Sequence, residues 1–146
     1  MYNLAIIGAG PAGIFTALEI QKIKPDWKII IVEKGSKIEK RKCLLREGYE
    51  KCPRCKKCGL LCGWGGGGAF SDGKLTLTPD VGGHLLDYMD RAHVDEMIKY
   101  TDDLYLKFGA TEVVYGNDKN LSADIERAAT LAELKLVHSP VRHLGT

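Results

Sequence analysis

The chain has 146 residues, of which 45% are hydrophobic and 27% charged, and its formal net charge is +2. That length allows one domain with a real core, burying about two thirds of its unfolded surface, but it is short for a complete two-domain enzyme. The small net charge gives no global reason to expect a nucleic-acid partner, and no apolar run approaches the roughly 20 residues that span a bilayer. We expect a soluble, cytoplasmic protein without a signal peptide.

The first 35 residues predict a βαβ unit. Asn3–Ile7 is typical of a strand, Gly8-Ala-Gly-Pro-Ala-Gly13 of a tight turn, Pro11–Lys22 of a helix and Ile29–Glu33 of a second strand. The continuous apolar runs predict strands buried on both faces of a parallel sheet. The order and spacing of these pieces are those of a dinucleotide-binding fingerprint.

Each residue type in this fingerprint has a physical reason. Gly8 allows the tight turn, Gly10 lets the backbone approach a pyrophosphate, and Gly13 lets the helix pack closely on the strand. Pro11 is suited to the first helical position, and the helix start offers N–H donors to phosphates. Glu33, 20 residues after Gly13, can accept from ribose hydroxyls and disfavours a 2′-phosphate. An ordinary glycine turn is the alternative. The predicted cofactor-binding residues here are Gly8, Gly10, Pro11, Ala12, Gly13, Glu33 and Lys34.

A basic stretch follows. Between Lys37 and Lys57 there are nine Lys or Arg and three Glu residues, a local balance of +6. Such a run usually forms a solvated loop, and the main alternative is that some of its groups lie beside cofactor phosphates. Nucleic-acid binding is disfavoured because no aromatic platform is interleaved with the charges.

Five cysteines lie between positions 43 and 62. Crowding of this kind is typical of metal or thiol chemistry rather than of a secreted disulfide scaffold. The C-x2-C-x2-C-x3-C spacing is that of bacterial ferredoxins, although Gly63 replaces the usual proline and there is no second run. It favours an iron–sulfur cluster, with tetrahedral zinc and a metal-free thiol site as alternatives. The predicted ligands are Cys52, Cys55, Cys58 and Cys62, with Cys43 as a substitute for Cys62.

The region from residue 84 predicts a mixed α+β segment, preceded by a short strand at Leu75–Thr78. A helix ending at Gly109 is expected to bury one apolar face. Its predicted core residues are Val94, Met97, Ile98, Leu104, Tyr105 and Phe108.

Further along the chain, Thr111–Tyr115 predicts a short strand, and Ser122 is a candidate N-cap for a helix reaching Glu133. Lys135–Leu144 reads as extended chain interrupted by Pro140. The sequence offers no Ser/His/Asp arrangement, so we name no catalytic residue.

The segment Gly63-Trp-Gly-Gly-Gly-Gly-Ala-Phe-Ser-Asp-Gly-Lys-Leu75 contains four consecutive glycines. Their entropic cost suggests that backbone must approach a ring system or diphosphate closely, with a flexible connector as the alternative. Together with NLAIIGAGPAG, IIIVEKG and the cysteine run, this segment resembles the N-terminal part of the FAD-dependent dehydrogenases of the two-dinucleotide-fold flavoprotein group. Family members typically read GFGGAGAFSDGKL, so Trp64 and Gly67 are mild departures. Val141–Thr146 also resembles the family's RHxGTD segment.

This resemblance implies FAD rather than NAD in the fingerprint, with Gly66, Gly68, Ser71 and Lys74 near the flavin. It implies an α/β fold: a Rossmann-like FAD-binding βαβ unit at 1–36, a basic, Cys- and Gly-rich insertion at 37–83, and a partial α+β segment at 84–146. It also implies that the chain is the N-terminal part of a longer protein and is inactive alone.

The leading hypothesis is therefore a FAD-dependent oxidoreductase, in which the flavin carries hydride or electrons and a cysteine-bound centre exchanges electrons with it. The alternatives are a non-enzymatic redox- or metal-sensing nucleotide-binding module and an NAD-binding dehydrogenase domain. The sequence does not indicate the substrate or the electron donor.

Overall fold

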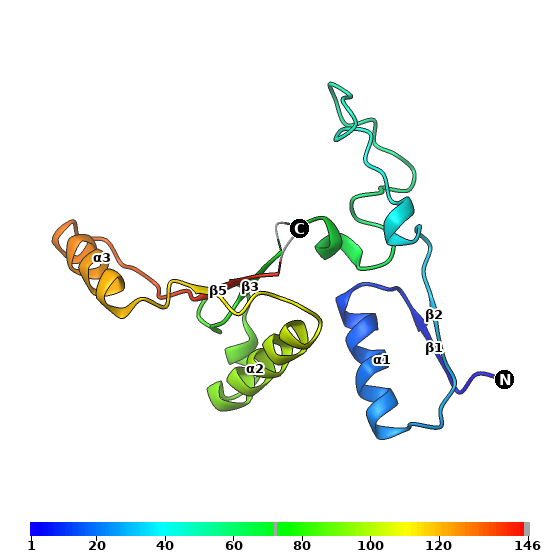
Figure 1. The fold of residues 1–146 in the computed structure, drawn as a ribbon, viewed down its shortest axis with the longest axis horizontal. Helices are drawn as coiled ribbons and strands as arrows, with labels where there is room; N and C mark the ends of the chain where they lie inside the picture. The colour runs from blue at the N-terminus through cyan, green and yellow to red at the C-terminus, as the bar shows by residue number, and fades with distance from the viewer. Residues whose placement is uncertain (72, 145–146) are drawn as a thin grey trace. The chain divides into compact units, whose positions relative to one another are not determined.

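A computed structural model describes residues 1–71 and 73–144 and shows a mixed α/β chain (Figure 1). The chain divides into two compact units, Met1–Ser71 and Asp72–Thr146, which are described separately. None of the helices among the described residues is both long and apolar enough to cross a membrane.

The first unit begins with the predicted βαβ arrangement. Strand β1 (Leu4–Ile7) leads into helix α1 (Pro11–Ile23), and strand β2 (Ile29–Val32) follows. The two strands pair in parallel, with Leu4 opposite Ile29 and Ile7 opposite Val32. The predicted strand–helix–strand order is confirmed, with boundaries that differ by one residue.

The sheet of this unit is covered on one face. Helix α1 packs on both strands, and exposure alternates along β1, as period-2 side chains require. On the opposite face Ile7 is 80% exposed and Val32 is 47% exposed. Burial on both faces is thus wrong for the described residues, because α1 supplies a single layer.

After β2 the chain forms a long irregular excursion with two short 3₁₀ helices, η1 (Ile38–Lys40) and η2 (Gly66–Phe70). The cysteine run lies between them without helix or strand. Helix η2 begins after Gly65, which has a left-handed backbone with φ of +82°. A residue with a Cβ is disfavoured there, which explains one of the consecutive glycines.

The second unit contains a small antiparallel sheet in the order β3-β5-β4. Its strands are β3 (Lys74–Thr76), β4 (Val114–Tyr115) and β5 (Val141–His143). Pro140, which lacks an N–H group, immediately precedes β5, where it removes no ladder bond from the central strand. The remaining elements are η3 (Leu85–Asp87), α2 (Arg91–Lys107) and α3 (Lys119–Leu131).

Helix α2 confirms the predicted amphipathic helix. Asp90 caps its start by accepting from the His93 N–H at 3.0 Å, and Gly109 follows its end with φ of +97°. Val94 is 1% exposed and forms part of the core. Phe108 was predicted to be core but is 73% exposed; it has the spacing of the apolar stripe but follows the last helical residue, Lys107, as the C-cap.

Helix α3 begins one turn earlier than predicted. Its N-cap is Asp118, whose carboxylate accepts from the N–H groups of Asn120 at 2.9 Å and Leu121 at 3.0 Å. Ser122, the predicted cap, lies inside the helix. Asp118 starts the helix because its carboxylate satisfies N–H groups that otherwise lack partners.

An ion pair fastens β5 to α2. Arg142 is 6% exposed, and its Nη2 lies 2.8 Å from Oδ2 of Asp102, with a second bond from Nε to the same carboxylate. Its Nη1 donates to the Thr111 carbonyl at 2.7 Å. Hydrogen bonding to Asp102 raises the pKa of Arg142, so the guanidinium keeps its charge inside this unit.

Candidate functional site

The turn between β1 and α1 requires glycine at positions 8 and 13, two of the positions predicted from the fingerprint. Gly8 has φ of +105°, and its N–H donates to the Val32 carbonyl at 2.8 Å. A Cβ on Gly13 would overlap the carbonyl oxygen of Gly8. Close packing of α1 against the end of β1 therefore requires Gly13, as predicted.

Gly10 differs from these two glycines because its backbone does not require the residue type. Its φ of −79° and ψ of 179° suit any amino acid, and a Cβ added there would meet nothing within 4 Å. The open space lies at the start of α1, where Pro11 is the first residue and the first turn carries no acidic side chain. Helix geometry leaves the N–H groups of Ala12 and Gly13 without intrahelical acceptors, since the first bond of the helix is donated by the Ile14 N–H to the Gly10 carbonyl at 3.0 Å. This opening and these donors fit a phosphate.

Glu33 lies against the turn. Its Oε2 accepts from the Ala9 N–H at 2.9 Å and its Oε1 from the Gly35 N–H at 2.8 Å. The bond from Ala9, and after it the bond from Gly35, lower the pKa of Glu33. The positive charge of Lys34 lowers this pKa further. A carboxylate has about four acceptor positions, so two bonds leave room for ribose hydroxyls.

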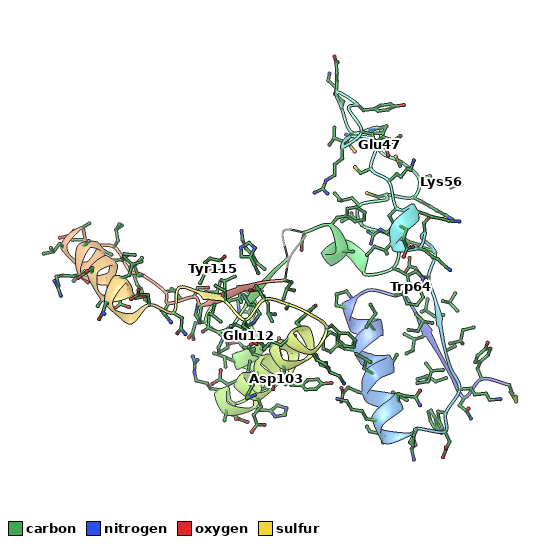
Figure 2. All side chains as sticks on the ribbon, viewed as in Figure 1. Glu47, Lys56, Trp64, Asp103, Glu112 and Tyr115 are labelled. Atoms are coloured by element: carbon green, nitrogen blue, oxygen red, sulfur yellow. The ribbon has the colours of Figure 1, made fainter. Side chains whose placement is uncertain are left out.

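The glycine-rich segment packs on the same turn. The N–H of Gly65 donates to the Ala9 carbonyl at 2.9 Å. The N–H of the preceding residue, Trp64 (labelled in Figure 2), donates to the Ser36 carbonyl at 3.2 Å. A Cβ on Gly66 would lie 3.2 Å from the Gly10 Cα, and Gly66 has φ of +61°. The segment is therefore a packed element, and its glycines allow this contact.

The other residues predicted near a flavin fall in both units. Gly68 has open space where a Cβ would be, and Ser71 closes η2 by donating from Oγ to the Gly68 carbonyl at 3.0 Å. Lys74 lies in the second unit, at the start of β3 opposite His143. The structure thus brings Gly66, Gly68 and Ser71 onto or next to one short helix, and Lys74 belongs to a different unit.

Arg41 is a structural residue that the sequence did not single out. It is 6% exposed and stands over the Phe70 ring, 4.6 Å from its centroid, so the expectation of a solvated loop is wrong at this position. Its guanidinium donates to four carbonyls at 2.7 to 2.9 Å. These belong to Gly59, Leu60, Trp64 and Gly66.

Arg41 therefore ties the end of the cysteine run to the glycine-rich segment and, through that segment, to the turn. Arginine is preferred over lysine where several fixed donors are needed. That preference was the one available signal, and it does not distinguish Arg41 from Arg46 and Arg54 in the same basic stretch.

The cysteines are free thiols. Cys52 and Cys55 are exposed, while Cys43, Cys58 and Cys62 are half-buried. Over residues 1–71 and 73–144, no three Cys, His, Asp or Glu side chains form a group that could hold a metal ion. In this arrangement the thiols do not fit a cluster or a zinc ion, so the predicted metal site continues to rest on the spacing of the cysteines.

Comparison with known proteins gives one informative match. The chain is 32% identical over 124 residues to an uncharacterized protein of Clostridium beijerinckii. The match covers 84% of this chain and 22% of that protein, so the chain spans about a fifth of the relative's length. No family model matches the chain, and no solved structure matches it.

Proposed function

We propose that the chain provides the ADP-binding part of a FAD-dependent oxidoreductase. The observation that carries this proposal is the bond from the Ala9 N–H to the Glu33 carboxylate at 2.9 Å. It holds a ribose acceptor directly against the turn that has space for a pyrophosphate at Gly10. A glycine turn of an ordinary α/β fold needs neither the carboxylate nor the space.

The residues of the turn divide the work of binding. The start of α1 directs N–H groups and the positive end of the helix dipole at the pyrophosphate, whose approach depends on the missing side chain of Gly10. Glu33 accepts from the ribose hydroxyls as a carboxylate, and its lowered pKa keeps it ionised in mildly acidic solution as well. The bound FAD would supply the hydride chemistry, and the protein supplies position and electrostatics.

The glycine-rich segment supports a flavin better than a smaller nucleotide. Gly66 brings backbone against the Gly10–Pro11 step, and Gly68 leaves space beside it where a flat ring can approach. We propose that Gly66, Gly68 and Ser71 border the flavin end of the cofactor. Lys74 lies in the second unit, so its predicted place near the flavin continues to rest on the resemblance alone.

The length of the relative supports a further part of the proposal. The matched region is 22% of that protein, and the exposed apolar face of the β1–β2 sheet gives a surface for additional elements to cover. We propose that catalysis belongs to the longer protein. ADP is therefore the sharpest probe of the chain itself, because the described site matches the ADP half of FAD.

The test is calorimetric titration of the chain with ADP, FAD and NAD⁺, using Gly10→Val as the variant. Valine is compatible with this backbone and meets no protein atom at its Cβ, so the melting temperature should stay within about 2 °C, as for a substitution away from structural features. Affinity for ADP should fall by about tenfold or more, equivalent to about 1.4 kcal/mol.

Gly67→Ala is the matched control. Its Cβ would make an ordinary contact 3.6 Å from Leu61, so ADP affinity should be unchanged. Absence of ADP binding to the wild-type chain would overturn the proposal. Wild-type affinity in Gly10→Val would show that the phosphate position is wrong. Tighter binding of NAD⁺ than of FAD would favour the dehydrogenase alternative.

A further inference from the structure

A basic hollow lies between the loop after β2 and the cysteine run. Its volume is about 180 Å³, which is enough for a small polyatomic ligand. The side chains that matter to the argument are those of Ser36, Lys40, Lys42, Lys57, Cys58 and Cys62. No carboxylate of the described residues lines it, and neither does Gly10 or any other residue of the Gly8–Gly13 turn.

The lysine ammonium groups around the hollow are not neutralised by an ion pair, in contrast to those of Lys22 and Lys99. Lys22 pairs with Glu19 at 2.9 Å and Lys99 with Asp103 at 2.6 Å. Among the described residues, no hydrogen bond or ion pair involves the side-chain ammonium group of Lys40, Lys42 or Lys57; the backbone N–H of Lys40 donates to the Lys37 carbonyl at 2.9 Å. Three like charges around one small space repel one another, and an anion placed between them removes that repulsion.

Arg41 adds a fourth positive charge to the lining and also determines which anion suits it. Its Nε, Nη1 and Nη2 are engaged with backbone carbonyls, so its planar fork is not available to bind a carboxylate. The ligand would therefore be bound by lysine ammonium groups, which act as point charges and are well suited to phosphate. Ser36 adds a hydroxyl donor.

We propose that the basic hollow binds a phosphate group, as the free anion or as a small phosphate monoester. The site is separate from the space at Gly10, so this proposal does not depend on the proposed FAD-binding function. The hollow is nevertheless next to the proposed ribose acceptor. Gly35 lines the hollow, and its N–H donates to the Glu33 carboxylate at 2.8 Å, so a phosphate bound there can influence nucleotide binding. The thiols of Cys58 and Cys62 would lie beside the bound phosphate.

The first test is calorimetric titration of the full chain with inorganic phosphate, with sodium chloride as the reference at constant ionic strength. We expect saturable binding at one site and an affinity about tenfold lower in Lys57→Gln, equivalent to about 1.4 kcal/mol. Lys56→Gln is the matched control, since Lys56 is the adjacent exposed lysine on the same loop (Figure 2) and does not line the hollow. Lys57 is exposed, so its replacement should leave the fold intact, as circular dichroism would verify.

The second test locates the ligand. Thiol labelling with neutral iodoacetamide, mapped by mass spectrometry, should show that phosphate slows modification of Cys58 and Cys62 but not of Cys52 and Cys55. A parallel titration with glycerol phosphate distinguishes a phosphate monoester from the free phosphate anion. The ligand that binds more tightly indicates which of these two classes the hollow takes. Gly10→Val should keep its phosphate affinity even where it loses ADP.

Four outcomes would overturn the proposal. These are the absence of saturable phosphate binding, equal losses in Lys56→Gln and Lys57→Gln, equal protection of all labelled thiols, and loss of phosphate binding in Gly10→Val. The last would mean that phosphate occupies the nucleotide turn. Failure of ADP binding with intact phosphate binding would instead count against the proposed function alone.

Discussion

Among the described residues, each unit contains one buried arginine, and the two have different partners. Arg142 and Arg41 are both 6% exposed. Arg142 faces the carboxylate of Asp102 and joins a strand to a helix, whereas Arg41 faces four backbone carbonyls and joins two irregular segments. The charge of Arg142 is neutralised where it lies, and that of Arg41 is only solvated by dipoles.

The difference in partners determines how far the field of each arginine extends. A paired arginine serves the packing of regular elements and contributes little field beyond its partner. An arginine bonded to carbonyls keeps its net charge, so its field extends to its surroundings, here the basic hollow and the loop after β2. In the first unit, Arg41 therefore both holds two loop segments together and contributes to a positive potential that attracts anions.

Among the variants that compare the two arginines, Arg142→Met is expected to lower the free energy of unfolding the most. This change leaves Asp102, whose side chain is 14% exposed, without its partner, and breaking a buried pair costs up to about 3–5 kcal/mol. Urea unfolding followed by circular dichroism measures the loss. The double variant Arg142→Met/Asp102→Leu removes both charges and should recover most of the stability; no recovery would mean that the pair is not the main source of the effect.

A smaller loss of stability is expected for Arg41→Lys. Lysine keeps the charge but cannot supply the fixed fork, so some carbonyls lose their donors, and each unsatisfied buried acceptor costs about 1–3 kcal/mol. Limited proteolysis should show faster cleavage between residues 58 and 70. Arg46→Lys is the control, because the Arg46 guanidinium donates to one carbonyl, that of Phe70 at 3.3 Å, at an exposed position. Equal cleavage in the two variants would contradict the role of Arg41.

The smallest effect concerns pH and Glu33. Because its pKa in the folded chain lies below the ordinary value of 4.5, Glu33 contributes stability that is complete above that value and is lost as the pH falls through the lowered pKa. The melting temperatures of wild type and Glu33→Gln should therefore differ at pH 7 and converge in acid. Asp80→Asn gives the corresponding curve for the second unit, where hydrogen bonding to Arg91 lowers the pKa of Asp80. A constant difference at all pH values would exclude ionisation as the cause.

Elements with local signals could be predicted from the sequence. The βαβ unit and α2 follow from glycine, proline and apolar spacing within a few residues, and the structure has them with small boundary changes. Asp118 was missed as a cap although its signal is equally local, because Ser122 is also a good cap and lies closer to the apolar residues of α3.

The parts that could not be predicted depend on distant segments. The bonds of Arg41 join residues 18 to 25 positions apart, and nothing in the neighbourhood of Arg41 specifies them. Exposure of Ile7 depends on which layers cover the sheet, and a strand's own residues do not contain that information. The structure leaves open space at Gly10, and the predicted approach of a pyrophosphate to this glycine stays a prediction.

The close contact between Gly35 and Gly63 has a consequence for how this region can vary. A Cβ on Gly35 would overlap the backbone of residues 62 and 63, and the Trp64 N–H bonds the Ser36 carbonyl at 3.2 Å. The excursion between Gly35 and Gly63, which is part of the first unit, thus begins and ends at nearly one point. Doubling the length of such a closed excursion costs only about 0.6 kcal/mol in loop entropy. The outer part of this excursion, residues 43–56, can therefore be lengthened or shortened, while Gly35, Gly63 and the bond from Arg41 to the Gly59 carbonyl hold its base together.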